Sequence, residues 1–275
     1  MHPQDREAIG PTRRPLTSII ILTLNELACT RLCLESLAAH TPEPHEVIVV
    51  DNGSHDGTVD FLRRVRGVRL IANRQNRGFA GGCNQGMVAA RGDLLLLLNN
   101  DCVVTPGWLA GLGRVLDSRP RAGMAGPVSN YVSGPQLDRE ARYSTMEEML
   151  RHAAATAARE RGRATSVGRL VGLCLLFPRS LMERIGLLDE RFGRGNFEDD
   201  DYCRRALIAG YELLIAHEVF IHHFGSRTFQ ANQIDYLAEH ERNRAVYRAK
   251  WNDLPAPRPL PAEAGDPLAA GWQPA

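Results

Sequence analysis

The amino-acid sequence predicts an α/β protein with a mostly parallel central sheet flanked by helices. The first hundred residues alternate short apolar, β-branched runs with helix-length segments, a pattern typical of βαβ units. Turn-forming and acidic residues follow several of these runs, and parallel sheets bind ligands beyond the carboxyl ends of their strands. With 275 residues, of which 44% are hydrophobic and 24% charged, the chain can bury a large core without disulfides.

Each predicted element of the first hundred residues has a local reason. Residues 17–24 are apolar and β-branched, as in a strand buried on both faces, and leucines recur at helical spacing in residues 27–40. Asp56 is expected to cap the helix that follows it. In order, these elements are a strand at 17–24, a helix at 27–40, a strand at 47–50, a helix from 56 to 66, a strand at 68–72, a glycine-rich helix at 78–91 and a strand at 94–98.

The second half of the chain is less regular. Residues 135–163 are polar and rich in Arg, Ala and Glu, and we interpret them as a helical insertion or a lid. The other elements expected here are helices at 106–117, 146–158, 199–209 and 234–251, and strands at 122–128, 170–177, 211–216 and 219–223. The predicted organisation is an N-terminal extension (1–16), one domain (17–252) with an insertion at about 135–165, and a disordered Pro/Ala-rich tail (253–275).

Charge and cysteine content exclude several classes of protein. The 33 basic and 32 acidic residues give a formal charge of +1, so no global electrostatic attraction to nucleic acid is expected. Lys250 is the single lysine, which disfavours Schiff-base and P-loop chemistry. The six cysteines form no C-x-x-C motif, which favours core thiols in a reducing compartment. Without an apolar N-terminal segment or a spanning apolar run, the sequence predicts a cytoplasmic location.

Polar residues follow the first two predicted strands. Thr23, Asn25 and Glu26 come after the first strand, and Asp51 and Asn52 come after the second. An aspartate at a strand end can accept hydrogen bonds from a pyrimidine N–H or from ribose hydroxyls. Asn, Asp, Gly and Ser also dominate ordinary turns, so this segment alone leaves a binding site and a simple turn equally open.

A second polar cluster, Asn99, Asn100 and Asp101, follows five consecutive leucines. So apolar a strand is expected in the centre of the sheet, with its terminal acid presented at the ligand crevice. A lone carboxylate there suits a hard divalent cation that bridges a substrate diphosphate. The alternative is an N-cap for the following helix.

The third cluster is the acidic run of residues 198–201. Four consecutive acids repel one another, and the helix macrodipole with its free N–H groups explains one or two of them but not four. His222 and His223 close a later strand, where adjacent side chains point to opposite faces, so only one of them is expected to face a site. The sequence carries no G-x-G-x-x-G after its first strand, no G-x-S-x-G and no H-E-x-x-H.

Taken together, these clusters resemble the inverting glycosyltransferases of family 2, in particular their bacterial rhamnosyltransferase-like branch. The resemblance runs from about residue 17 to residue 229 and implies the GT-A fold of nucleotide-diphospho-sugar transferases. It is carried by SIIILTLNE (18–26), VIVVDNGSHDGT (47–58), NRGFAGGCNQG (76–86), LLLLLNNDCVV (94–104), NFEDDDYCRRALIAGYEL (196–213) and HHFGSRTF (222–229).

The resemblance also implies roles for individual residues. Asp101 matches the last acid of the family's metal-binding D-x-D, whose first position is Asn99 here, and His223 fits an H-x-x-S pattern that supplies a further metal ligand. In the acidic run, Asp199 is the expected catalytic base, with Glu198 and Asp201 beside it. The expected nucleotide- and donor-binding residues are Thr23, Asn25, Glu26, Asp51, Asn52, Asn76, Gly78, Asn84, Asn99 and Asn100.

The implied reaction is a single in-line displacement that inverts the anomeric carbon. The implied cofactor is Mn²⁺ or Mg²⁺, the donor a UDP- or dTDP-linked sugar, and the acceptor a saccharide or lipid-linked hydroxyl in bacterial polysaccharide or cell-wall synthesis. A lipid-linked acceptor is compatible with peripheral contact at the inner face of the membrane. Two alternatives stay open, a nucleotidyltransferase of similar architecture and an inert relative that binds nucleotide sugar or glycan. The first is disfavoured because no basic residue precedes Arg31 in the loop after the first strand.

Overall fold

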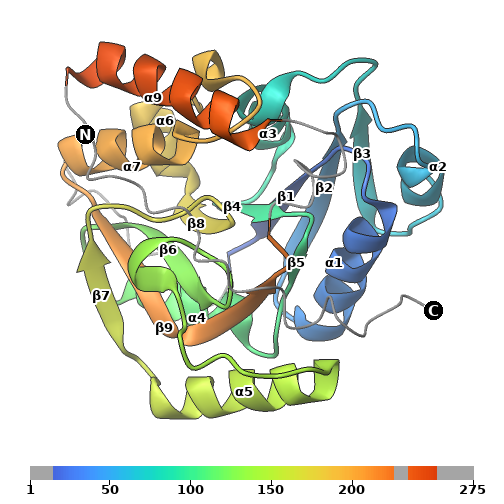
Figure 1. Cartoon of the computed structure of the whole chain (residues 1–275). Helices are drawn as coiled ribbons and strands as arrows, with labels where there is room; N and C mark the ends of the chain where they lie inside the picture. Colours follow the sequence, from blue (N-terminus) through green and yellow to red (C-terminus); the bar gives the residue numbers. More distant parts are fainter. Residues whose placement is uncertain (1–14, 226–234, 253–275) are drawn as a thin grey trace.

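A computed structural model describes residues 15–225 and 235–252 of the chain (Figure 1). In this part of the chain, nine strands form a sheet with the order β3-β2-β1-β4-β8-β6-β9-β5, and β7 pairs with β9. The strands are β1 (Thr17–Thr23), β2 (His45–Asp51), β3 (Val68–Ala72), β4 (Leu94–Asn99), β5 (Cys102–Val103), β6 (Ala122–Ser129), β7 (Ala164–Val167), β8 (Cys174–Pro178) and β9 (Glu212–His223).

Helices cover both faces of this sheet, and a buried apolar cluster lies on each side of it. The helices are α1 (Leu27–His40), α2 (Thr58–Leu62), α3 (Gly78–Ala89), α4 (Trp108–Asp117), η1 (Gly134–Gln136), α5 (Met146–Arg159), α6 (Arg179–Ile185), η2 (Glu190–Phe192), α7 (Glu198–Ile208) and α9 (Tyr236–Trp251). The predicted α/β class with a mostly parallel sheet is confirmed. All six cysteines are buried and free, as the sequence predicts.

The parallel part of the sheet, β3-β2-β1-β4, follows the sequence prediction closely. The glycine-rich helix α3 lies directly against β1. At two of its glycines there is no room for a side chain between the helix and the strand. A Cβ on Gly82 would lie 2.2 Å from Leu22 Cδ1, and one on Gly86 would lie 2.3 Å from Ile20 Cγ2. These glycines therefore let the helix approach the strand that carries Thr23 at its end.

One helix of this part is shorter than predicted. Helix α2 ends at Leu62 rather than residue 66, because the N–H groups of Arg64 and Val65 bond three residues back instead of four. Arg64 N donates to Phe61 O and Val65 N donates to Leu62 O, a 3₁₀-type ending. The N-cap of α2 is Gly57 rather than the predicted Asp56, although Asp56 Oδ1 still accepts from Thr58 N at 3.0 Å.

The second part of the sheet is mixed. Strand β8 runs antiparallel to β4 and β6, β6 runs parallel to β9, and β5 and β7 pair antiparallel with β9. The two strands predicted at 211–216 and 219–223 are one continuous strand, β9, whose register against β6 shifts between Pro127 and Val128. A β-bulge therefore accounts for the polar interruption that the sequence pattern suggested was a turn.

Strand β8 begins four residues later than predicted. The residues before it use their backbone N–H groups on side chains instead of on a neighbouring strand. Leu170 N donates to Cys203 Sγ, and Val171 N donates to Gln136 Oε1 at 2.8 Å. The short elements β5, β7 and α6 were not predicted, because two to seven residues carry too little periodicity to recognise.

The insertion is anchored away from the sheet's ligand edge. Helix α5 starts with a capping box between Thr145 and Glu148 and packs against β9 along the lower edge of the view in Figure 1. Tyr143 shares a 2.6 Å hydrogen bond with His222 Nδ1, and His152 Nε2 lies 2.8 Å from Asp138 Oδ2. The helical part of the insertion therefore packs as a support on β9.

Two further predictions concern the ends of the chain and its relation to membranes. The predicted extension before residue 15 and the predicted tail from residue 253 lie outside the described residues. Within residues 15–225 and 235–252, no helix combines the length and apolar character needed to cross a bilayer.

Candidate active site

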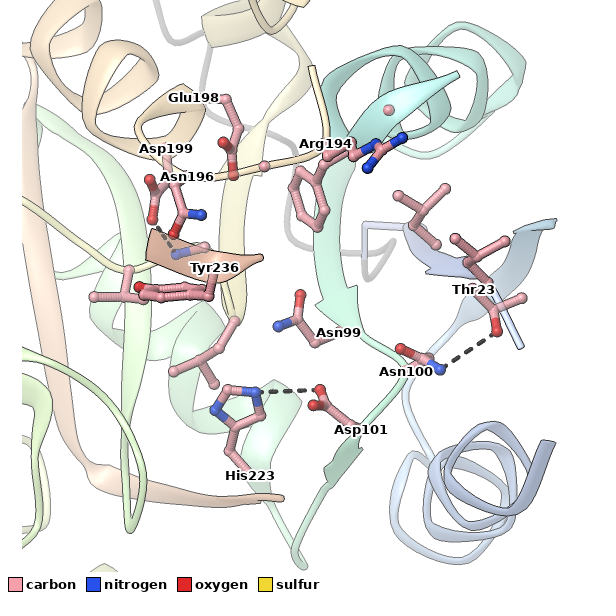
Figure 2. A pocket seen from close by; sticks show the side chains of 18 of the residues that line it. Thr23, Asn99, Asn100, Asp101, Arg194, Asn196, Glu198, Asp199, His223 and Tyr236 are labelled. Atoms are coloured by element: carbon pink, nitrogen blue, oxygen red, sulfur yellow. Dashed lines mark hydrogen bonds and ion pairs between the residues drawn. The ribbon is translucent and has the colours of Figure 1, made fainter. Parts of the chain in front are cut away.

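A cavity opens beyond the carboxyl ends of β1 and β4, where a parallel sheet is expected to bind its ligand. Its empty volume is about 1170 Å³, part of it open to solvent. Figure 2 shows acidic side chains from the start of α7 on one side and Asp101 with His223 on another. Of the sequence-predicted residues, the cavity is lined by Thr23, Asn52, Asn76, Gly78, Asn99, Asn100, Asp101, Glu198, Asp199 and His223.

Thr23 and Asn100 lie together at the ends of β1 and β4. The Thr23 hydroxyl contacts Thr30 Oγ1 at 2.9 Å, and the Asn100 Nδ2 group donates to Thr23 Oγ1 at 3.3 Å (Figure 2). Both side chains are buried. This network holds two polar side chains rigidly at the cavity wall.

Asn52 connects the loop after β2 with the start of α3. Its Nδ2 group donates to Asn76 Oδ1 at 3.1 Å and to Gly78 O at 2.9 Å, while its Oδ1 accepts from Asn73 Nδ2 at 3.0 Å. Gly78 has a φ of +77°, and an added Cβ there would lie 2.2 Å from Gly193 O. The amide network therefore joins two loops that are distant in sequence into one wall of the cavity.

Asp51 lies behind this wall and does not line the cavity. Its Oδ1 accepts from the N–H groups of Gly53 and Ser54 at 3.0 and 2.9 Å. Its Oδ2 is buried and has no hydrogen-bond partner among the described residues. A buried carboxylate oxygen left unpaired is costly, so this atom marks a place where a ligand N–H or O–H would be favourable.

Asn25, Glu26 and Asn84 do not line the cavity, and the side chains of Asn25 and Asn84 bond to backbone instead. Asn25 and Glu26 are left-handed, with φ of 58° and 60°, and Asn25 Oδ1 accepts from His55 N at 2.9 Å. Asn84 donates to Leu188 O at 2.9 Å and accepts from Leu188 N at 2.9 Å, which fastens α3 to the segment before η2. These contacts make Asn25 and Asn84 supports of loops next to the site.

Asp101 and His223 meet on the metal side of the cavity. Asp101 Oδ1 lies 3.1 Å from His223 Nε2, and the two residues are held by the pairing of β5 with β9. His223 Nδ1 lies 2.7 Å from Tyr131 O, so this nitrogen carries the proton and Nε2 is directed to Asp101. Metal-binding histidines commonly donate their other N–H to a carbonyl in this manner. A carboxylate beside an oriented imidazole is thus a donor set that fits a divalent ion.

Cys102 completes the group of metal-ligating atoms. The ligand atoms of Asp101, Cys102 and His223 all lie within 4.8 Å of one another. Burial and the neighbouring Asp101 carboxylate hold the pKa of the Cys102 thiol well above its usual value. The thiol is therefore neutral as long as no ion replaces its proton.

The two histidines at the end of β9 face opposite ways, as strand geometry predicts. His223 lines the cavity, whereas His222 is turned to Tyr143 of the insertion. The open question of which histidine faces the site is thereby answered. Ser226 of the H-x-x-S pattern lies outside the described residues.

The acidic run separates into two pairs on different sides of α7. Glu198 and Asp199 line the cavity, and Asp199 Oδ2 accepts from Gly172 N at 2.8 Å (Figure 2). The other two acids form ion pairs. Asp200 pairs with Arg169 at 3.4 Å, and Asp201 pairs with Arg205 at 2.9 Å and with Lys250 at 2.6 Å. Successive helical residues are about 100° apart, so a run of four must divide between two environments. Asp201, expected beside the base, is therefore part of a buried ion-pair network.

Sequence reasoning missed Arg194 and Tyr236, which also line the cavity. Arg194 is exposed, and it is the only arginine or lysine among the described lining residues. It lies in a Gly-Arg-Gly-Asn segment with positive φ at Gly193, Gly195 and Asn196. This glycine-rich loop before the acidic helix is the sequence signal from which Arg194 could have been predicted as a site residue. Tyr236 opens α9, and its sequence surroundings carry no comparable signal.

Comparison with known proteins places these features in a family context. Residues 18–186 match the model described as glycosyl transferase family 2. The chain is 28% identical over 242 residues to the N-acetylglucosaminyl-diphospho-decaprenol L-rhamnosyltransferase of Mycobacterium tuberculosis, and the match covers 78% of each chain. It is also 28% identical over 212 residues to the uncharacterized protein y4gI of Sinorhizobium fredii, covering 72% of this chain but only 23% of that protein.

A solved structure shares the fold. The mannosyltransferase PcManGT from Pyrobaculum calidifontis, in complex with GDP-Man and Mn²⁺, superposes with a TM-score of 0.61 at 20% identity. The superposition covers 89% of this chain and 67% of that one. At this level of identity the likeness establishes the architecture, which is the expected GT-A fold.

Proposed function

Because the chain belongs to glycosyl transferase family 2, we propose that it transfers a sugar from a nucleotide-diphosphate donor to a hydroxyl acceptor with inversion of the anomeric carbon. The observation that carries the proposal is the meeting of three groups in one cavity. These are the polar wall around Asn52, the pair Asp101 and His223, and the acids Glu198 and Asp199. A displacement of this kind needs those functions together, namely donor binding, charge stabilisation on the leaving group and a base for the acceptor.

The nucleotide is proposed to lie along the ends of β1 and β2. Asp51 does not line the cavity, but its buried Oδ2 has no hydrogen-bond partner among the described residues. We assign this atom to the ring N–H of uracil, thymine or guanine, which would have to reach past the residues that cover it. Thr23 and the Asn52 network form the adjacent wall. Among these bases, we favour a UDP- or dTDP-linked donor, in keeping with the family branch that the sequence resembles.

The divalent ion is proposed to be held by Asp101 and His223, with the remaining positions left to water and substrate oxygens. Asn99 lines the cavity beside them and supplies a neutral amide in place of a second acid. When bound, Mn²⁺ or Mg²⁺ would neutralise charge on the nucleotide diphosphate. PcManGT, which shares the fold, was solved with Mn²⁺ and GDP-Man, in support of this assignment.

Asp199 is proposed to take the proton of the acceptor hydroxyl as that oxygen attacks the anomeric carbon. Its Oδ1 and Oδ2 accept from Asp200 N at 3.0 Å and from Gly172 N at 2.8 Å, which fixes the carboxylate at the cavity wall. General-base help of this kind contributes about 10²–10⁴-fold to the rate. Glu198 lies beside it and adds negative charge that favours a cationic or partly positive sugar in the displacement.

The acceptor is proposed to enter past Arg194, Tyr131 and Tyr236. An exposed guanidinium and two tyrosine rings in the cavity lining suit a saccharide carried on a phosphate or diphosphate. The rhamnosyltransferase relative is named for a lipid-linked diphosphate acceptor, which supports the same class here. Such an acceptor would bring the protein to a membrane surface.

Calorimetric titration of UDP, dTDP and GDP, each with and without Mn²⁺, tests the proposal. One diphosphate is expected to bind, with an affinity that Mn²⁺ raises about tenfold or more, because the ion bridges protein and diphosphate. Asp101→Ala should remove that dependence on Mn²⁺ while the metal-free affinity stays within about twofold. A catalytically inert relative would bind the nucleotide but release no diphosphate from the corresponding nucleotide sugar. Binding of none of the three to folded protein would contradict the proposal.

A further inference from the structure

The metal side of the cavity contains a thiol that the proposed reaction does not use. We propose that Cys102 Sγ is a third protein ligand for soft divalent ions, so that Zn²⁺ is bound by Asp101, Cys102 and His223 at a position set back from the cavity, with its fourth position left to water. The proposal rests on the proposed function only in taking Asp101 and His223 as metal ligands. It assigns to this chain a second state of the same centre, chosen by the type of ion.

The strand pairing places Cys102 and His223 next to each other. They are direct partners in the antiparallel pairing of β5 with β9. Side chains at such a position point to the same face, with Cβ atoms about 4.5–5.5 Å apart. Asp101 comes immediately before Cys102, and Phe224 N donates to Asp101 O at 3.0 Å, which closes the turn around the three side chains.

The distances are close to those that zinc requires. Bond lengths of about 2.3 Å to sulfur and about 2.0–2.1 Å to nitrogen or oxygen put ligand atoms of a tetrahedral site about 3.5 Å apart. Asp101 Oδ1 and His223 Nε2 are already 3.1 Å apart, and the widest separation in the group is within 4.8 Å. Side-chain adjustments of about 1 Å would therefore complete three of the four positions.

The position of the thiol explains why zinc would occupy a different place from a catalytic ion. Asp101, His223 and Leu173 line the cavity, whereas Cys102 is fully buried behind them and its Sγ lies 3.8 Å from Leu173 O. An ion bound to Cys102 is drawn into the wall. It is then withdrawn from the side of the cavity that the donor diphosphate reaches.

Ligand softness makes the site selective. Thiolate favours zinc and other soft ions, whereas Mg²⁺ and Mn²⁺ favour oxygen ligands and leave a thiol protonated. Binding is balanced by proton loss, since the S–H bond breaks, an S–Zn bond forms and the proton leaves to solvent. The same three residues can therefore hold Mn²⁺ at the cavity through two of their side chains and Zn²⁺ inside the wall through all three.

Cobalt spectroscopy tests the assignment without a catalytic assay. Co²⁺ is titrated into the full-length, metal-free protein, and the near-ultraviolet charge-transfer band of a thiolate–cobalt bond is recorded for wild type, Cys102→Ser and Cys174→Ser. Cys174 is the matched control, because it is equally buried on β8 but lies outside the group of three ligands. Zn²⁺ and Mn²⁺ affinities are measured by calorimetry on the same proteins.

The expected result is a charge-transfer band in wild type and Cys174→Ser and its loss in Cys102→Ser. Zn²⁺ should bind Cys102→Ser at least about tenfold more weakly, with the Mn²⁺ affinity changed by less than about twofold. Co²⁺ binding without the band, or a band that persists in Cys102→Ser, would overturn the thiol assignment and leave the Asp101–His223 site standing. If neither Co²⁺ nor Mn²⁺ binds folded protein, the metal part of the proposed function fails as well.

Discussion

The two sides of the cavity are built in different ways. The side made by β1, β2 and α3 presents neutral polar groups that are hydrogen-bonded to one another, as in the Asn52–Asn76 contact. The rest of the cavity, made by β9, α7 and the turn after β4, is called the charged side because it presents charged groups, with Asp101 facing His223 and Asp199 held by backbone N–H groups. The first side has the rigidity of a binding surface, and the second has the charged groups that a displacement uses.

This difference shows how one fold separates affinity from turnover. On the neutral side, several residues that the family pattern assigns to the donor are also structural, as Asn84 is through its bonds to Leu188. On the charged side, the structural and cavity-facing members of the acidic run are separate residues, since Asp201 pairs with Arg205 while Asp199 lines the cavity. Substitutions on the two sides should therefore have different consequences.

The largest effect is expected for Asp199→Asn on the charged side. Loss of the general base should lower turnover by at least about 100-fold, while nucleotide affinity and thermal stability stay close to wild type. The measurement is acceptor glycosylation at saturating donor, together with nucleotide titration. Asp200→Asn is the control, because Asp200 does not line the cavity and should retain most of the turnover. Wild-type-like turnover in Asp199→Asn would remove Asp199 as the base.

Asn84→Ala tests whether a family-assigned residue on the neutral side is structural. It removes the bonds to Leu188 and should lower the free energy of unfolding by about 2 kcal/mol, because two buried backbone groups lose their partners. Urea unfolding measures this loss. Val88→Ala, at an exposed position on the same helix, should change stability by less than about 0.5 kcal/mol. A normal stability with a large loss of nucleotide affinity would reverse the assignment.

Asp51→Asn separates binding from support at a single residue. Asn can still accept from Gly53 N and Ser54 N through Oδ1, but it places an N–H₂ group where the carboxylate Oδ2 would receive a base N–H. We expect nucleotide affinity to fall about tenfold with little change in the unfolding transition. Equal affinity of wild type and variant in the titration would show that the base does not reach this residue.

The smallest effect is expected for an ion pair away from the cavity. Asp189 contacts Arg191 at 2.6 Å and Lys250 at 2.7 Å, and these partners hold the pKa of its carboxyl well below the usual range. The stability it contributes is present above the usual carboxyl pKa and is lost as pH falls through the lowered one. Because the pair is partly solvated, Asp189→Asn should cost less than about 1 kcal/mol at pH 7. Urea curves of wild type and variant should converge as the solution is acidified.

The sequence predicted the parallel part of the sheet and the clustering of strand-end polar residues, since both follow from local patterns. Helix α1 has the predicted bounds, and the strands before residue 100 differ by only a few residues. The family and the enzyme class are confirmed by the comparison with known proteins. The individual site residues stay predictions until the measurements above are made.

What the sequence could not predict depends on contacts between distant segments. Nothing local in the acidic run distinguishes Asp199 from Asp201, because their environments are made by Gly172 and by Lys250. The same holds for Asn84, whose partner Leu188 is 104 residues away. Strand β9 was divided in two because a bulge and a turn leave similar polar interruptions in the pattern.

The ion pairs of Asp200 and Asp201 restrain the rotation of α7 about its axis, and this rotation determines where the Asp199 carboxylate lies in the cavity. Side-chain atoms lie about 5–6 Å from a helix axis, so a 20° roll of α7 would swing the Asp199 carboxylate by about 2 Å. An error of about 1 Å can cost two orders of magnitude in rate. Asp201 resists such a roll through Lys250 and Trp251, the last two residues of α9. Lys250, the sole lysine of the chain, thus restrains the rotation of α7. Its substitution should displace the Asp199 carboxylate before it unfolds the protein.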